Sequence, residues 1–216
     1  MTESHMPNGS VRFDLEDGVA TITLDRPETL NSMNDDLMQD LSSALSEVEQ
    51  NQDVRVAVIT GEGRGFCSGA DLKAMSDPNR RKIIAADGTG PGPMGPTRMQ
   101  NSKPVIAAFE GFGINAGCAL ALACDLVVAG ESSFIQIGEI QQGAPIPMNA
   151  AWMRLKLPEF VLSRMALLGD RITGPEMFRL GVATECVADD EVLSRSRKMA
   201  TRIAGFPPGG AVNIKQ

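Results

Sequence analysis

Two segments of the chain share one design, in which a strand of buried type runs into a loop of small residues and then into a helix. The first is Val56–Thr60 followed by Phe66–Leu72, and the second is Val105–Phe109 followed by Gly111–Cys118. Small residues at a helix entrance let a ligand approach the backbone, and the free N–H groups there favour negative charge. Two such entrances that face each other would form an oxyanion hole.

Each loop taken singly also has a plainer interpretation, in which its glycines serve tight turns and close packing of helix on sheet. A third interpretation treats Gly111, Gly113 and Gly117 as a dinucleotide-binding fingerprint, although their spacing is not GxGxxG and the acidic partner is unclear. The glycine loops alone therefore leave packing, anion binding and dinucleotide binding open, and packing is favoured for either loop by itself.

Strands and helices are predicted to alternate around these loops. Val11–Leu15 and Val19–Leu24 alternate apolar and polar residues around Asp17-Gly18, which predicts a hairpin. Asn34 is predicted to cap a helix that reaches about Gln50. The remaining expected elements are strands at 54–60, 104–109, 126–129 and 134–137, and helices from 71, at 115–123, at 154–168 with an interruption near Pro158, at 175–181 and at 189–204. This order predicts an α/β fold.

Charge, hydropathy and cysteine usage exclude several classes of partner. The net charge is −7 without a basic run, so nucleic-acid binding is not expected. No stretch approaches the ~18–20 apolar residues of a membrane span, so no membrane partner is expected. The four cysteines lack CxxC spacing and His5 is the only histidine, so we expect no metal site. A cytoplasmic location is the simplest expectation.

Four strings of residues resemble, in order over about residues 11 to 205, successive signatures of the crotonase (enoyl-CoA hydratase/isomerase) superfamily: VATITLDRPETLNSMN, VAVITGEGRGFCSGADLKAM, KPVIAAFEGFGINAGCALALACDLVVA and GPEMFRLGVATECV. The resemblance implies a crotonase-like (ClpP/crotonase) repeated β-β-α spiral that binds acyl-CoA thioesters. It also implies a homotrimer or a dimer of trimers. We expect a flexible N-terminus at 1–10, a core at 11–188, and a short C-terminal helical region at 189–216 that is truncated relative to the family.

The resemblance also implies a site. In the family, the alanine of the GAD motif and a residue of the second glycine loop donate the two oxyanion N–H groups, and these positions correspond to Ala70 and Ala116. Contacts with the CoA moiety are implied for Ala70, Asp71, Leu72 and Lys73, and for the Arg26–Leu30 loop (Arg26, Leu30) near the adenine end. Coenzyme A would enter as part of the substrate, with no other cofactor required. Asn115 occupies a position where the family usually has glycine, so the local shape of this loop is expected to depart from the family pattern.

The acid–base group decides which chemistry this site supports. Hydratases of the family use two glutamates, and the corresponding positions here are Ala119 and Glu139, with one extra residue between Phe134 and Glu139. One carboxylate can shuttle a proton between two carbons, so we expect a Δ3-Δ2-enoyl-CoA isomerase-type reaction, provided that an apolar pocket near Ile114, Ile140 and Pro145 raises the pKa of Glu139.

Several alternatives remain open from the sequence. One is an enoyl-CoA hydratase with an atypical site, and another is a catalytically silent protein that binds acyl-CoA. Glu139 could also be a surface glutamate in a turn, although its place in the family pattern favours a catalytic role. Glu110 and Glu131 are nearby acids typical of exposed loops. The Gly- and Pro-rich segment Asp87–Pro96 is predicted to be a mobile loop. The resemblance to the family implies that this loop borders the acyl pocket.

Overall fold

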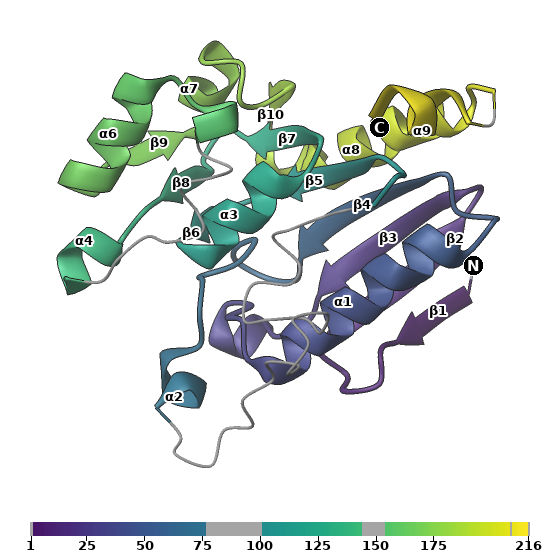
Figure 1. Cartoon of the computed structure of the whole chain (residues 1–216), viewed down its shortest axis with the longest axis horizontal. Coiled ribbons are helices and arrows are strands. Elements are labelled where there is room, and N and C mark those ends of the chain that lie inside the picture. The colour runs from purple at the N-terminus through teal and green to yellow at the C-terminus, as the bar shows by residue number, and fades with distance from the viewer. Residues whose placement is uncertain (1, 77–100, 144–153, 208, 216) are drawn as a thin grey trace.

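Seven strands form the main sheet, and their order across the sheet follows their order along the chain (Figure 1). The computed structural model describes residues 2–76, 101–143, 154–207 and 209–215. The strands in sheet order are β1 (Thr2–His5), β2 (Val11–Glu16), β3 (Val19–Leu24), β4 (Val56–Gly61), β5 (Val105–Phe109), β7 (Leu126–Gly130) and β10 (Glu185–Val187). The pairs β1–β2 and β2–β3 are antiparallel, and every later pair is parallel.

A second sheet of three strands lies beside one end of the main sheet (Figure 1). It consists of β6 (Phe112–Ile114), β8 (Phe134–Gln136) and β9 (Arg171–Thr173). The α-helices whose two ends are described are α1 (Asp35–Gln50), α2 (Leu72–Met75), α3 (Ala116–Ala123), α4 (Glu139–Gln142), α6 (Glu159–Leu168), α7 (Gly174–Arg179), α8 (Val192–Ala204) and α9 (Gly210–Lys215), and residues 154–156 are also helical. Two short 3-10 helices are η1 (Pro27–Thr29) and η3 (Asp189–Glu191).

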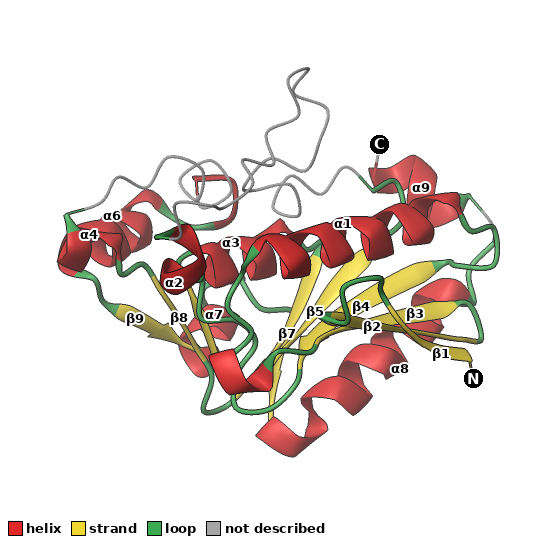
Figure 2. Ribbon diagram, turned by 90° about the horizontal axis from the view of Figure 1, so that it is seen from below, coloured by secondary structure: helices red, strands yellow, loops and turns green. Residues whose placement is uncertain are grey.

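Helices cover both faces of the main sheet, with α1 and α3 on one face and α8 on the other (Figure 2). Along β4, Ala57 and Ile59 belong to the core cluster that contains α1 and α3, whereas Val56 and Val58 pack with the residues of α8. A strand buried on both faces needs apolar residues throughout, which accounts for the unbroken run at this strand.

The predicted hairpin and the predicted helix cap are confirmed. β2 and β3 pair across Asp17 and Gly18, whose φ values of 49° and 79° are those that a type I′ turn requires. The side-chain oxygen of Asn34 accepts a hydrogen bond of 2.9 Å from Leu37 N, and α1 then runs to Gln50. The other predicted strands and helices of the described residues are present, with ends shifted by a few residues.

The N-terminal segment differs from the expected flexible residues 1–10. Thr2–His5 form β1, which pairs with β2, and the backbone N–H groups of Asn8 and Ser10 donate to the carboxylate of Asp40 at 3.0 and 2.9 Å. Asp40 lies on α1 and is fully buried. A polar sequence can form an edge strand, because backbone hydrogen bonds rather than side-chain burial hold it in place.

Candidate active site

The two glycine loops lie directly against each other. Cys67 of the first loop pairs with Gly113 in a short parallel bridge, with Cys67 N donating to Phe112 O and Ile114 N donating to Cys67 O, both at 3.0 Å. A Cβ atom on Gly117 would lie 2.2 Å from Cys67 O, so only glycine permits this approach. The bridge therefore joins two segments that are more than forty residues apart in the sequence.

Ala70 follows this bridge and lies on the solvent-exposed side of the first loop. Gly69 O accepts from Met33 N at 2.7 Å, and Asp71 N donates to Met33 O at 3.0 Å. In a parallel bridge of this kind, the N–H of the residue between the two bonds points away from the partner, so Ala70 N–H faces away from Met33. Within the described residues, the hydrogen bonds leave Ala70 N–H unused.

Ala116 is the first residue of α3, and its N–H belongs to the helix donors that have no partner within the helix. The first loop passes beside it, because a Cβ atom on Gly69 would lie 3.6 Å from Ala116 N. Since Gly69 immediately precedes Ala70, the structure brings the two predicted donor positions to one place. That both N–H groups aim at a single point remains a prediction.

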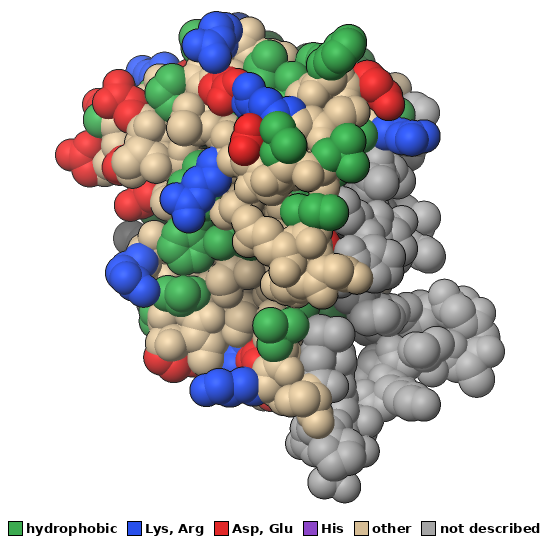
Figure 3. Space-filling view, turned by 90° about the vertical axis from the view of Figure 1, so that its left-hand side faces the viewer, with side chains coloured by type: hydrophobic (Ala, Val, Ile, Leu, Met, Phe, Trp, Pro, Cys, Tyr) green, Lys and Arg blue, Asp and Glu red, His purple; other side chains and the backbone are tan. Residues whose placement is uncertain are grey.

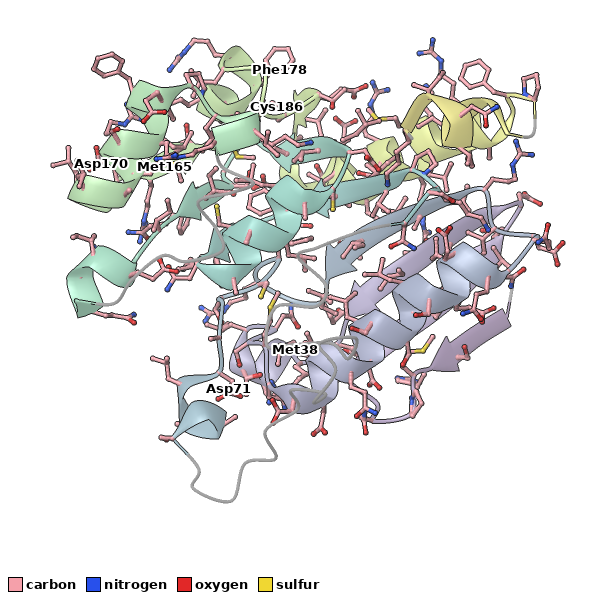
Figure 4. All side chains as sticks on the ribbon, viewed as in Figure 1. Met38, Asp71, Met165, Asp170, Phe178 and Cys186 are labelled. Atoms are coloured by element: carbon pink, nitrogen blue, oxygen red, sulfur yellow. The ribbon has the colours of Figure 1, made fainter. Side chains whose placement is uncertain are left out.

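Arg26 and Asp71 contact each other. The Arg26 guanidinium lies 3.3 Å from Asp71 Oδ2 and donates to Ser32 O at 2.5 Å, while Asp71 Oδ1 accepts from Ala74 N and caps α2. Figure 4 places Asp71 where the chain enters α2. Burial raises the pKa of Asp71, but the Ala74 N–H and the guanidinium outweigh it, so the pKa is lowered. This ion pair holds the chain next to Ala70.

The other residues predicted at the CoA moiety lie around this pair. Leu30 has a left-handed backbone (φ 57°), and its carbonyl accepts from Ser68 N at 3.0 Å. Leu72 and Lys73 are exposed on α2. Leu30 therefore joins the first glycine loop to the Arg26–Leu30 loop, whereas Leu72 and Lys73 are accessible to a ligand.

Asn31 is a positioning side chain that sequence reasoning missed. It is fully buried, its Oδ1 accepts from Arg26 N, and its Nδ2 donates to Glu62 O and Gly65 O, with all three distances 2.9 Å. Its φ of 54° lies in the left-handed region, which asparagine tolerates better than most residues. An asparagine in a tight loop between two motifs was the available signal.

Glu139 is the first residue of α4 and is half-buried, with its Oε2 atom shielded from solvent. Burial raises the pKa of its carboxyl, and the N–H groups of Glu139 itself and of Gly138 oppose this shift without cancelling it. The charge of Glu139 also contributes to the raised pKa of the Cys118 thiol on α3, so Glu139 lies near the helix that begins with Ala116. The two alternative acids, Glu110 and Glu131, are both exposed.

Asn115 connects the second glycine loop to the segment that carries Glu139. Its side-chain Oδ1 accepts from Gly138 N at 2.6 Å, and its backbone N–H donates to Gln136 O at 3.0 Å. Its backbone angles, φ 52° and ψ −113°, lie in a region that glycine adopts readily and other residues rarely do. The carbonyl of Asn115 accepts from Ala119 N and so begins the hydrogen bonding of α3.

Two parts of the predicted site cannot be placed relative to the residues above. The segment Asp87–Pro96 and Pro145 lie outside the described residues. Within the part of the chain that is described, no group of His, Cys, Asp and Glu side chains could hold a metal ion, and no helix is both long and apolar enough to span a bilayer. The four cysteines are free thiols.

Comparison with known proteins agrees with this arrangement of loops and sheets. An enoyl-CoA hydratase from Mycobacterium tuberculosis H37Rv superposes with a TM-score of 0.86 at 28% identity, covering 95% of this chain and 80% of that one. The chain therefore has the fold of the crotonase superfamily. Its sequence matches the enoyl-CoA hydratase/isomerase family over residues 14–216, and it belongs to that family.

Relatives of similar identity have names that denote different reactions. The chain is 33% identical to 1,2-epoxyphenylacetyl-CoA isomerase from Escherichia coli K12, over 94% of this chain and 79% of the relative. It is 31% identical to (E)-benzylidenesuccinyl-CoA hydratase from Thauera aromatica, over 95% of this chain and 80% of the relative. Membership of an acyl-CoA enzyme family is thus established, while the names of the relatives include both hydratases and isomerases.

Proposed function

We propose that the protein is a Δ3-Δ2-enoyl-CoA isomerase-type enzyme in which Glu139 moves the proton. The observation that carries this proposal is a half-buried carboxyl with a raised pKa beside α3. Ala119, where hydratases of the family have their first glutamate, is fully buried and has no proton to exchange. The shielding of Glu139 Oε2 from solvent favours acid–base chemistry over a catalytically silent, acyl-CoA-binding role.

The proposed reaction uses the two loops and one carboxylate. Glu139 takes a proton from C2 of the 3-enoyl thioester, and the electron pair passes through the carbonyl to give a dienolate. The N–H groups of Ala70 and Ala116 stabilise the negative oxygen of that dienolate. Protonated Glu139 then delivers the proton to C4, which leaves the 2-enoyl thioester and regenerates the carboxylate. Atoms and charge balance without a water molecule or a second acid.

We propose that coenzyme A enters as part of the substrate, with no further cofactor. The ion pair between Arg26 and Asp71 supports a role in shaping the loop that carries Ala70, while the exposed Lys73 is available to the phosphates of CoA. Leu30 and Leu72 would line the path of the CoA moiety, with Leu72 exposed on α2.

Hydration of a 2-enoyl-CoA is the second candidate reaction, because hydratase names are common among the relatives, including one that is 31% identical and one that is 34% identical. It requires a water molecule to be positioned and deprotonated while a proton reaches C2, a task for which the family uses two carboxyls. With alanine at position 119, Glu139 would have to serve both steps. This makes hydration the less favoured reaction.

The test compares both reactions in the purified protein. We expect conversion of a 3-enoyl-CoA to its 2-enoyl isomer to exceed hydration of the matching 2-enoyl-CoA by at least about 10²-fold in kcat/KM, the scale of a missing acid–base group. Chromatographic detection of both products from each substrate gives the ratio directly. Hydration as fast as isomerisation would contradict the proposed reaction.

We propose that the protein assembles as a homotrimer or a dimer of trimers in the cytoplasm. Support for assembly comes from apolar side chains exposed near the second sheet, and Figure 3 shows several hydrophobic groups on the face that carries α4 and α6. They include Phe160, Leu167 and Leu168 on α6, with Phe160 90% exposed. Sedimentation equilibrium should give three or six times the 23.0 kDa chain mass, and a monomer would contradict this proposal.

A further inference from the structure

We propose that Asn115 is a positioning residue, whose side chain fixes the segment carrying Glu139 relative to the N–H group of Ala116. The proposal rests on the role of Glu139 given above and adds a residue whose side chain need not touch the substrate. Two contacts carry it: Asn115 Oδ1 accepts from Gly138 N at 2.6 Å, and Asn115 N donates to Gln136 O at 3.0 Å.

The backbone of Asn115 is the first argument that its side chain matters. With φ 52° and ψ −113°, position 115 has a conformation in which an L side chain is strained and glycine is not. The surrounding segments hold it there, since its N–H donates to β8 and its carbonyl accepts from Ala119 N in α3. Glycine would fit this backbone with less strain, so the side chain has a use that offsets the strain.

The position of its partner is the second argument. Gly138 directly precedes Glu139, and a Cβ atom at Gly138 would lie 3.3 Å from Asn115 Oδ1, so the two segments are in close contact. The next residue after Asn115 is Ala116, the proposed oxyanion donor. One side chain thus connects the residue before the donor to the residue before the base, across 23 positions of sequence.

The hydrogen bond between Asn115 and Gly138 also allows the pKa of Glu139 to be altered by a substitution at position 115. Gly138 N–H also lies close enough to the Glu139 carboxyl to lower its pKa. A carboxylate at position 115 would share that N–H with Glu139 and repel its negative charge, which raises the pKa of Glu139. Among the described residues, Cys118 on α3 interacts electrostatically with Glu139, and the charged groups on α6, the helix that packs against α4, are Glu159 and Arg164.

The side chains of Arg164 and Arg171 have partners of their own, so a change in the pKa of Glu139 can be attributed to the substitution at position 115. Arg164 pairs with Asp170 and Glu176, and Arg171 stacks over Phe134 at 4.1 Å. Burial and the N–H groups of Glu139 and Gly138 account for the shifted pKa of Glu139. A change at position 115 therefore acts on Glu139 while Arg164 and Arg171 are already held by other groups.

The experiment compares Asn115→Gly and Asn115→Asp with the wild-type chain in isomerase assays from acid to neutral pH, with Glu139→Gln measured in parallel. For Asn115→Gly we expect kcat to fall by about 10-fold or more, because the base loses its fixed position, while KM changes by less than about twofold. Its melting temperature should equal or exceed that of the wild type, since the strained φ is relieved.

Asn115→Asp keeps the acceptor oxygen, so it should recover more turnover than Asn115→Gly at neutral pH. The acid limb of the pH–activity profile of Asn115→Asp should lie at higher pH than that of the wild type, because the pKa of Glu139 is raised. An Asn115→Gly enzyme with wild-type kcat and pH profile would overturn the proposal, and so would a parallel loss of stability and activity. If Glu139→Gln itself keeps full turnover, the proposed function fails, which is a separate outcome from failure of the Asn115 proposal.

Discussion

Replacement of Glu139 by Gln is expected to lower isomerisation of 3-enoyl-CoA by at least ~10²-fold, the largest effect that we predict for a single side chain. The substitution keeps the shape of the side chain and removes the base. The affinity for acyl-CoA should change little, because the proposed oxyanion donors are backbone groups. Steady-state assays of kcat, together with calorimetric titration of a non-reacting acyl-CoA, separate the two quantities.

The pH profile gives the same prediction an independent test. Burial raises the pKa of Glu139 above its usual 4.5, and a protonated carboxyl cannot accept the C2 proton. Turnover of the wild type should therefore fall as the pH drops through this raised pKa, and the residual activity of Glu139→Gln should lack that limb. Glu131→Gln, at an exposed glutamate just after β7, is the matched control and should behave as the wild type. Unchanged turnover in Glu139→Gln would remove this residue from the mechanism.

Replacement of Gly117 by Ala should destabilise the fold and disable the site together. The added Cβ would lie 2.2 Å from Cys67 O and 2.9 Å from Cys67 C, both backbone atoms that cannot rotate away. Overpacking of this kind costs about 1–3 kcal/mol of unfolding free energy, and each kcal/mol lowers Tm by about 2–4 °C for a chain of this size. Separation of the loops would also displace Ala116 N–H, so turnover should fall on the order of 10²-fold.

A control for this substitution exists within the same chain. A Cβ atom added at Gly210, at the start of α9, would meet no neighbouring atom of the described residues within 4 Å, and the φ of Gly210 is not left-handed. Gly210→Ala should therefore leave Tm unchanged or raise it slightly, because alanine favours the helix. Thermal unfolding of Gly117→Ala and Gly210→Ala under the same conditions gives the two Tm values to be compared. A Gly117→Ala protein with wild-type Tm and turnover would contradict the contact between the two glycine loops.

Much of the fold was predictable because its signals are local. The turn at Asp17 and Gly18 and the cap at Asn34 each depend on residues within three or four positions, so the sequence alone indicates them. The contact of Cys67 with Gly113 is not local, and only the family resemblance placed the two loops together. β1 was missed because its side chains are polar and its hydrogen bonds come from β2.

The candidate site was predictable only in part, for a related reason. The positions of Ala70, Ala116 and Glu139 came from motif order, and the structure places them around the same loops. The roles of Asn31 and Asn115 depend on side-chain bonds to backbone groups 34 and 23 residues away, respectively, which no periodicity reveals. Sequence patterns indicate which face of an element is buried, but they do not specify such single partners.

The strand order of the main sheet has a consequence for synthesis of the protein on the ribosome. From β1 to β10, each new strand joins the sheet beside the strand made before it, with β6, β8 and β9 set aside in their own layer. The sheet can therefore grow in one direction as the chain emerges, without insertion of a late strand between two early ones. At every stage the next strand adds at the edge formed by the most recently made strand, while β1 stays at the opposite edge, and α8, which follows β10, covers the remaining bare face.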